Sequence, residues 1–195
     1  PLYSSAASDV YKRQEMLKHG LISNTAHWAE LLNFNTSDID YTALKQLVGR
    51  SVQVKEDIVE QDPFEHGIRK ALNLGHTVGH AFESMALAEN RPVLHGYAVA
   101  WGIVCELYLS HLKVGFPKEK MRQTIQFIKD NYGVFTFDCK KYEQLYAFMT
   151  HDKKNTSGTI NFTLLKDIGD IRINQIADKD TIFEMLDFYR ECMGI

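Results

Sequence analysis

The chain has 195 residues, a net charge of −3, and 45% hydrophobic and 24% charged residues, a composition that excludes a disordered or fibrous protein. Basic residues never run longer than two in a row, so no nucleic-acid surface is expected. No apolar stretch approaches the ~20 residues of a membrane span, no signal-peptide pattern occurs, and the three cysteines are far apart. The sequence therefore predicts a reduced, cytoplasmic protein without membrane contact.

The predicted elements are mostly helices. Residues 1–14 have no apolar periodicity and are expected to be a non-native or disordered leader, which leaves residues 15–195 as the folded domain. A short helical segment that begins at Glu15 should end in a turn at Gly20. Apolar spacing then predicts helices, in chain order, over residues 25–32 (with Asn24 as N-cap), 38–55, 64–88, 95–112, 117–132, 142–149 and 178–192.

Two segments depart from the amphipathic helical pattern. The sequence from His95 to Leu112 is almost continuously apolar, which predicts a helix buried on most sides. Residues 159–165 alternate in part with a period of two, and a Gly-Asp turn separates them from residues 171–173. This pattern predicts a small β-hairpin near residues 159–175. The expected fold class is therefore mainly α with one minor β element.

Polar residues that could perform chemistry concentrate between residues 69 and 96. His76 and His80 are four apart, so on a helix both rings leave one face, within reach of one metal ion or one polyanionic substrate. Thr77 stands where a zinc protease would have its catalytic glutamate, which excludes that class. The same stripe continues through Arg69, Asn73 and Glu83.

Each of these residues also has an ordinary structural interpretation. His76 and His80 could simply be hydrogen-bonded core residues, although Gly75 and Gly79 beside them favour close approach of a ligand or of another backbone. His95 could be an unremarkable first residue of a helix. The remaining polar residues have similar alternatives: a surface ion pair for Glu65 and Arg69, a solvated side chain for Lys55, and a polar turn or an anion site for Asp152, Lys153, Lys154 and Asn155.

Taken together, these motifs closely resemble the C-terminal domain of the 3-dehydroquinate synthase family. The resemblance is carried by the pattern E-x-G-x-R-x-x-L-N-x-G-H-T-x-G-H-A-x-E of residues 65–83, by Leu94-His95-Gly96, by Asp152-Lys153-Lys154, and by Glu15-Met-Leu-Lys18-His-Gly-Leu-Ile22. It extends in one order from Glu15 to the end of the chain. Members of this family bind zinc and NAD and convert 3-deoxy-arabino-heptulosonate 7-phosphate to 3-dehydroquinate with loss of phosphate.

The resemblance implies a role for each matching residue. Glu15, His76 and His95 would be the ligands of Zn²⁺ (or of Co²⁺), so that His80 would not be a ligand. Glu65 and His80 would be the catalytic proton-transfer residues. The substrate, a small sugar phosphate, would be bound by Lys18, Lys55, Arg69, Asn73, His80 and Lys153, of which Lys153 is preferred over Lys154.

The chain departs from the family pattern in three ways, the first of which is Gln14, the residue before Glu15, at the junction with the leader. Tyr97 stands where many relatives have glutamate, which changes contacts around the metal site. No Gly-rich phosphate loop follows a strand, so no NAD-binding residue is expected here, and the family's N-terminal nucleotide-binding domain is expected to lie outside this sequence. The resemblance thus implies that this chain alone is inactive and that the complete enzyme is a homodimer. The alternatives are another sugar-phosphate cyclase, a metal-dependent polyol dehydrogenase, or a non-catalytic helical interaction domain.

Overall fold

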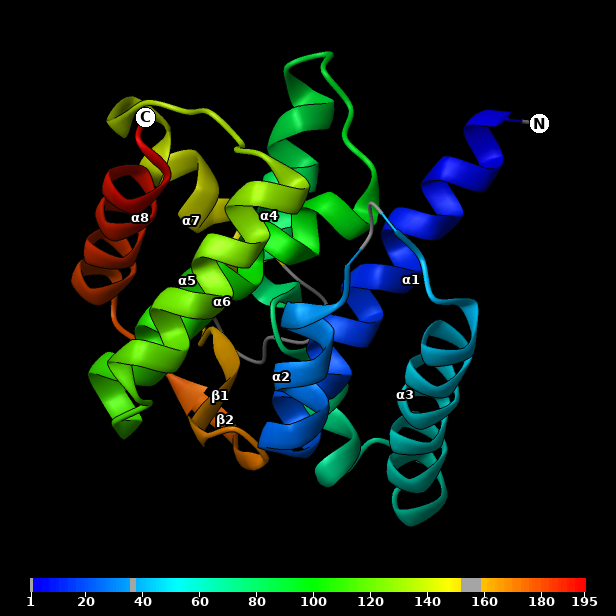
Figure 1. The fold of residues 1–195 in the computed structure, drawn as a ribbon. Helices are drawn as coiled ribbons and strands as arrows, with labels where there is room; N and C mark the ends of the chain where they lie inside the picture. Colours follow the sequence, from blue (N-terminus) through cyan, green and yellow to red (C-terminus); the bar gives the residue numbers. More distant parts are fainter. Residues whose placement is uncertain (1, 36–37, 152–158) are drawn as a thin grey trace.

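The computed structural model describes residues 2–35, 38–151 and 159–195, and for residues 2–11 it describes the backbone only. In these ranges helices dominate and the strands form one antiparallel pair (Figure 1). The elements in chain order are α1 (Leu2–Ser23), α2 (Thr25–Asn33), α3 (Tyr41–Gln61), the 3-10 helix η1 (Ile68–Asn73), α4 (His76–Ala88), α5 (His95–Val114), α6 (Lys118–Tyr132), the 3-10 helix η2 (Cys139–Lys141), α7 (Tyr142–Thr150), β1 (Asn161–Asp167), β2 (Asp170–Ile176) and α8 (Lys179–Met193). The prediction of a mainly α fold with one hairpin is confirmed.

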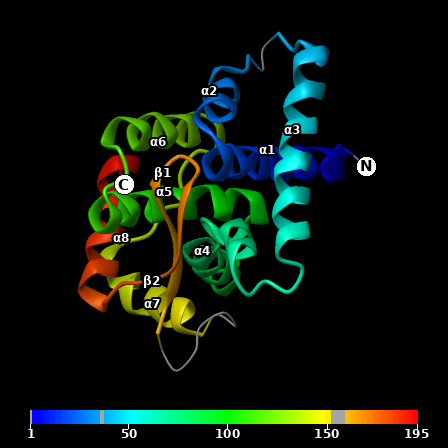
Figure 2. The same ribbon diagram turned by 90° about the horizontal axis from the view of Figure 1, so that it is seen from below.

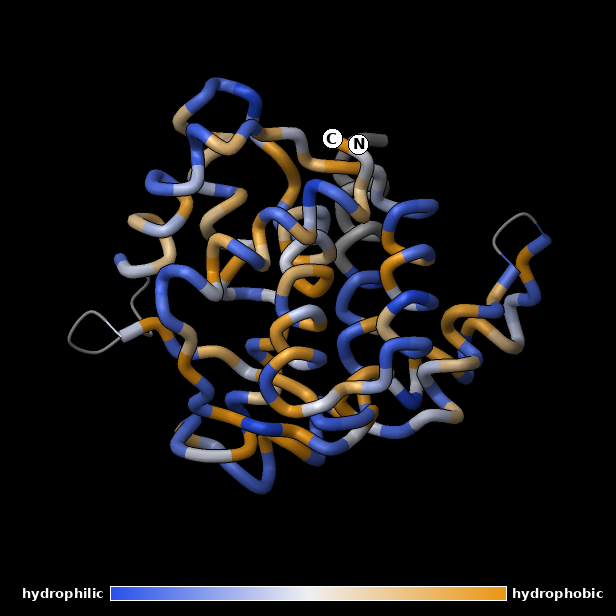
Figure 3. The backbone as a smooth tube through the Cα atoms, turned by 90° about the vertical axis from the view of Figure 1, so that its left-hand side faces the viewer, coloured by the Kyte–Doolittle hydropathy of each residue, from blue (hydrophilic) through white to orange (hydrophobic). Residues whose placement is uncertain are grey.

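Helix α5 is the centre of the molecule. It packs against α1, α4, α6, α8 and strand β1, and every residue from Ala98 to Leu107 is buried. Figure 2 shows the hairpin crossing α5, α4 beside it, and α3 toward the edge of the molecule. The continuously apolar sequence of this helix follows from neighbours on nearly all sides. Figure 3 shows hydrophobic and hydrophilic segments alternating along most of the other helices, as expected for helices with one buried face.

Side-chain caps fix the starts of α2, α3 and α8. Asn24 accepts a hydrogen bond from the backbone N–H of His27 at 2.9 Å, which confirms the predicted N-cap. Asp40 caps α3 through the N–H groups of Thr42 and Ala43, and Asp178 caps α8. The cap at Asp40 explains why α3 begins at Tyr41 rather than at residue 38. The helix also ends later than predicted, at Gln61 rather than at residue 55.

The predicted single helix over residues 64–88 is wrong. The chain forms η1, breaks at Leu74 and Gly75, and then begins α4 at His76. Gly75 has φ 81°, a left-handed conformation that glycine adopts without the strain a side chain would cause. The polar stripe predicted on one continuous helix is therefore divided between two elements.

The predicted turn at Gly20 is also wrong, because α1 continues to Ser23. A Cβ on Gly20 would lie 2.8 Å from a methyl carbon of Leu31 and 3.1 Å from the Cα of Trp28. Gly20 thus permits close packing of α1 against α2. The backbone of residues 2–11 belongs to α1, and Arg13 donates a hydrogen bond to the side chain of Asn131 at 2.9 Å; that residues 1–14 are a leader foreign to the domain stays a prediction.

Among the helices within the described ranges, none has both the length and the apolar character that crossing a bilayer requires.

Candidate metal and substrate site

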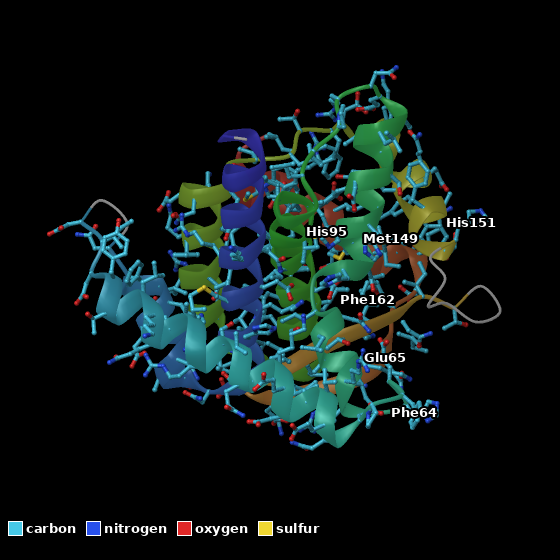
Figure 4. All side chains as sticks on the ribbon, turned by 90° about the vertical axis from the view of Figure 1, so that its right-hand side faces the viewer. Phe64, Glu65, His95, Met149, His151 and Phe162 are labelled. Atoms are coloured by element: carbon cyan, nitrogen blue, oxygen red, sulfur yellow. The ribbon has the colours of Figure 1, made fainter. Side chains whose placement is uncertain are left out.

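The rings of His76, His80 and His95 form a nearly equilateral triangle. Their centroids are 5.5 Å apart for His76–His80, 5.5 Å for His76–His95 and 5.7 Å for His80–His95. His76 and His80 come from the first two turns of α4, and His95 is the first residue of α5. In Figure 4 the labelled His95 lies on the face shown, above the labelled Glu65. The sequence pair His76–His80 thus gains a third imidazole from another helix.

Glycines set the distance between the two helices that hold this triangle. A Cβ on Gly102 of α5 would lie 2.0 Å from the carbonyl oxygen of Gly75, and one on Gly79 would lie 2.9 Å from the Cα of Val99. Because these neighbours are backbone atoms, a side chain at either glycine would push α4 and α5 apart. Gly79, which the sequence associated with close approach, and Gly102, which it did not, therefore let α4 and α5 pack closely enough to bring His76 and His95 together.

Hydrogen bonds orient the rings of His95 and His76. The Nδ1 atom of His95 lies 3.0 Å from Oε2 of Glu83, and Nδ1 of His76 lies 3.2 Å from the carbonyl oxygen of Leu74. A carbonyl oxygen can only accept, so Nδ1 of His76 carries the proton, and the same assignment holds for neutral His95 against the carboxylate. In each ring Nε2 then carries the lone pair that can bind a metal.

The ring spacing fits a metal held between His76 and His95. With a metal–nitrogen distance of about 2.0–2.1 Å and tetrahedral geometry, two coordinating imidazoles have centroids about 5 Å apart. As the rings stand, no three His, Cys, Asp or Glu side chains within residues 2–35, 38–151 and 159–195 converge in the geometry of a metal site. The described residues therefore provide a pair of imidazoles at a suitable spacing rather than a complete set of three ligands.

Glu15, Lys18 and His19 form a buried polar group on α1. Lys18 Nζ lies 2.5 Å from Oε1 of Glu15, and His19 Nε2 lies 3.8 Å from Oε2 of the same carboxylate. His19 Nδ1 also contacts the hydroxyl of Ser51 on α3 at 2.6 Å. Burial, with a contribution from the Lys18 charge, lowers the pKa of His19 to about 4, so this ring is neutral at physiological pH. Glu15 thus lies in direct contact with the Lys18 ammonium group.

A groove of about 630 Å³ opens beside this group, between α1 and α3. Glu15, His19 and Ser51 line it, together with the exposed Lys55 of α3. The structure therefore brings the predicted ligand Glu15 and the predicted substrate residue Lys55 to one cavity. His19 and Ser51 carried no signal in the sequence, because their proximity depends on how α1 and α3 pack.

The segment before η1 organises the other predicted substrate residues. Asp62 accepts hydrogen bonds from the backbone N–H groups of His66, Gly67 and Arg69 at 3.0, 2.7 and 3.0 Å. Within this loop Glu65 has φ 59°, an uncommon left-handed conformation for a residue with a side chain, and its Oε1 accepts from the Asn73 amide at 2.7 Å. Asp62 was not identified from the sequence, since its partners are backbone groups.

The predicted pairing of Glu65 with Arg69 is replaced by other contacts. Arg69 Nη1 donates to the carbonyl oxygen of Pro63 at 2.6 Å, whereas Glu65 is bonded to Asn73. The helical spacing on which the pair was predicted does not apply, because the segment is a loop followed by a 3-10 helix. Lys153 and Lys154 lie outside the described residues.

Tyr97 fits its surroundings as an aromatic residue. Its ring lies 5.8 Å from the ring of Trp101 and 5.8 Å, edge-on, from that of Tyr132. Aromatic pairs at such distances stabilise a protein beyond the area they bury. The departure from glutamate at this position therefore extends the aromatic core beside the triangle.

Comparison with known proteins assigns the sequence of this chain to a family. Residues 13–155 match the model of the family described as 3-dehydroquinate synthase C-terminal. The chain is 59% identical over 181 residues, 93% of its length, to a 3-dehydroquinate synthase of Parabacteroides distasonis, and 41% identical over 82% of its length to one of Leptospira interrogans. These stretches make up 51% and 45% of the relatives, so the chain spans about half the length of the curated relatives it matches.

Solved structures with low sequence identity share the fold. A 2-epi-5-epi-valiolone synthase of Streptomyces hygroscopicus with NAD⁺ and Zn²⁺ bound superposes with a TM-score of 0.76 at 18% identity, covering 95% of this chain and 52% of its own. A 2-deoxy-scyllo-inosose synthase complexed with carbaglucose-6-phosphate, NAD⁺ and Co²⁺ gives a TM-score of 0.67 at 19% identity over 93% of this chain and 51% of its own. The chain belongs to the 3-dehydroquinate synthase C-terminal family.

Proposed function

We propose that this chain is the metal- and substrate-binding half of a 3-dehydroquinate synthase, which converts 3-deoxy-arabino-heptulosonate 7-phosphate to 3-dehydroquinate and phosphate. The observation that carries the proposal is the 59% identity to a 3-dehydroquinate synthase over 93% of the chain. The reaction belongs to the shikimate pathway. A metal-dependent reaction of a sugar phosphate requires metal ligands, which the histidines can supply, and cations that bind phosphate, which Arg69 and the lysines can supply.

The residues proposed to hold the metal are Glu15, His76 and His95. The resemblance to the family assigns His95 rather than His80 as the partner of His76, and the Nδ1 hydrogen bonds of His76 and His95 leave Nε2 of both rings available to a metal. A Glu/His/His set leaves coordination positions for substrate hydroxyls. When bound, Zn²⁺ or Co²⁺ would polarise the substrate hydroxyl that is oxidised.

The remaining residues would bind and orient the substrate. Arg69 can clamp an oxyanion with two parallel N–H groups once its guanidinium leaves the Pro63 carbonyl, and Lys18, Lys55 and Lys153 supply further positive charge. His80 and Glu65 would hold or transfer a proton at the substrate, and Asn73, which donates a hydrogen bond to Glu65, would bind the substrate. Fixing one substrate conformation through oxidation, phosphate elimination, reduction and ring closure is the main contribution of these groups.

NAD is proposed to bind outside this chain in the complete enzyme. The sequence has no Gly-rich phosphate loop following a strand, and the curated relatives are about twice as long. The 195-residue chain alone should therefore form no dehydroquinate, and the full-length gene product should form it when supplied with NAD and Zn²⁺. Steady formation of dehydroquinate by the 195-residue chain alone would contradict the proposal that NAD binds outside this chain.

Metal titration tests the ligand set independently of activity. We expect His76→Ala and His95→Ala to weaken binding of Co²⁺ to the 195-residue chain at least tenfold, whereas His80→Ala leaves it within about twofold. His111→Ala is the matched control, because this partly buried α5 histidine bonds to the Phe116 carbonyl at the opposite end of the helix. Loss of metal in the His80 variant but not in the His95 variant would refute the assignment.

The fold likeness to other cyclases supports a second candidate, a different sugar-phosphate cyclase. A substrate panel with the full-length protein separates the two activities, since only one product is dehydroquinate. We also propose that the complete enzyme is a homodimer located in the cytoplasm. Light scattering of the full-length protein would give twice the mass of one chain.

A further inference from the structure

Glu106 is a fully buried acidic residue in the middle of the apolar helix α5. Its exposed fraction is 0%, and it is the one charged residue between Arg91 and Lys113. Removing a carboxylate from water is costly unless hydrogen bonds compensate for the lost hydration. Its contacts therefore indicate what this position stabilises.

Both carboxylate oxygens of Glu106 accept hydrogen bonds from the start of α4. Oε2 accepts from the backbone N–H of Gly75 at 2.6 Å, and Oε1 accepts from those of Thr77 and Val78 at 3.1 and 3.3 Å. The N-cap residue, Gly75, has no side chain to do this. The first N–H groups of a helix have no partner within the helix and carry partial positive charge, so an acidic group there is favourable.

These three amides flank His76 on both sides. The backbone on either side of His76 is thus fixed to α5, which is the helix that begins with His95. We infer that Glu106 is a positioning residue: by capping α4 from α5 it fixes where the His76 ring lies relative to His95. The inference rests on the proposed function, because it assigns Glu106 to the geometry of the proposed metal ligands.

Glu106→Gln is the variant that tests the inference. Glutamine keeps the size of the side chain but replaces one accepting oxygen with an NH₂ group, which cannot accept from a backbone N–H. Ser110→Ala is the matched control. Ser110 is equally buried one turn later on α5, but it bonds to the Glu106 carbonyl and to the N–H of Leu165 in β1 instead of to α4.

Two measurements on the 195-residue chain are needed. In metal-free protein, ¹⁵N NMR of the His76 ring should show the proton on Nδ1 in the wild type and in Ser110→Ala, and a mixture of tautomers in Glu106→Gln. Titration with Co²⁺ should show affinity lowered at least tenfold in Glu106→Gln and changed less than twofold in Ser110→Ala. Should Glu106→Gln fail to fold, Glu106→Asp, which keeps the charge but shortens the reach, is expected to show the same two effects more weakly.

The outcomes separate this inference from the proposed function. An unchanged His76 spectrum in Glu106→Gln, or equal effects in Glu106→Gln and Ser110→Ala, would overturn the positioning role. If the wild type takes up no Co²⁺ while the His76 spectrum still changes only in Glu106→Gln, the positioning role holds and the proposed metal site fails.

Discussion

Gly102 offers the sharpest test of how the site is built. Gly102→Ala would put a Cβ 2.0 Å from the carbonyl oxygen of Gly75 and 2.6 Å from the N of Gly79, both backbone atoms of the opposing segment. Ordinary van der Waals contact begins at 3.4 Å, so α4 and α5 would have to separate by about 1.4 Å. Overpacking of a well-filled core typically costs up to about 3 kcal/mol, and backbone neighbours that cannot rotate away place this variant at the upper end.

Thermal unfolding measures the effect on stability. A loss of about 3 kcal/mol should lower the Tm of a 195-residue protein by about 6–12 °C. Gly49→Ala is the control, since a Cβ at this exposed position of α3 would have no neighbour within 4 Å. That variant should gain up to about 1 kcal/mol from helix propensity and raise the Tm by about 2–4 °C.

The same substitution should also damage the histidine triangle. His76 lies on α4 and His95 on α5, and metal–ligand distances tolerate deviations of only about 0.2 Å. Affinity for Co²⁺ should therefore fall at least tenfold in Gly102→Ala and stay unchanged in Gly49→Ala. A Gly102→Ala protein with wild-type Tm and wild-type metal affinity would refute the view that close contact of α4 and α5 sets the site.

Two further predictions concern side chains away from the triangle. His27 is 4% exposed, and its burial, together with the nearby charge of Arg50, lowers its pKa below 6.5. Below this pH the unfolded chain therefore binds a proton at His27 that the folded chain does not bind. The free energy of unfolding should consequently fall as the pH drops below about 6.5. His27→Leu should weaken this decline in Tm measured between about pH 5 and pH 8, and an identical pH profile in both proteins would contradict the assignment. Asp62→Asn should weaken the hydrogen bonds that hold the loop leading to Arg69. In the full-length enzyme this substitution should raise the KM for the sugar phosphate about tenfold and change the affinity for Co²⁺ little. An unchanged KM would show that the Asp62 hydrogen bonds do not orient Arg69.

Part of the fold follows directly from local sequence patterns. The apolar run after His95 has the composition of a helix surrounded by neighbours, and α5 is that helix. The partial period of two after residue 159, with a Gly-Asp turn, correctly indicated the hairpin. Such patterns are informative because burial of one face, or of all faces, constrains which residue types a segment can carry.

The break before α4 shows where the local pattern is insufficient. Polar and apolar residues from Phe64 to Ala88 fit helical spacing, yet the backbone leaves the helix at Gly75. The reason lies on α5, where Glu106 accepts the free N–H groups of the new helix start and Gly102 admits the Gly75 carbonyl. A partner 31 residues away in sequence cannot be read from periodicity.

The sequence by itself determined which residues are available for chemistry: the histidines, Arg69, Glu15 and Glu65 stand in a specific order that resembles one family. Spacing alone paired His76 with His80, because i,i+4 neighbours share a helix face. Only the tertiary structure brought His95 to the same distance and showed that His76 and His95 have Nδ1 bonded to an acceptor. The position of His95 beside His76 depends on close backbone contact between α4 and α5. Such contact is set by long-range packing, which spacing along the sequence does not reveal.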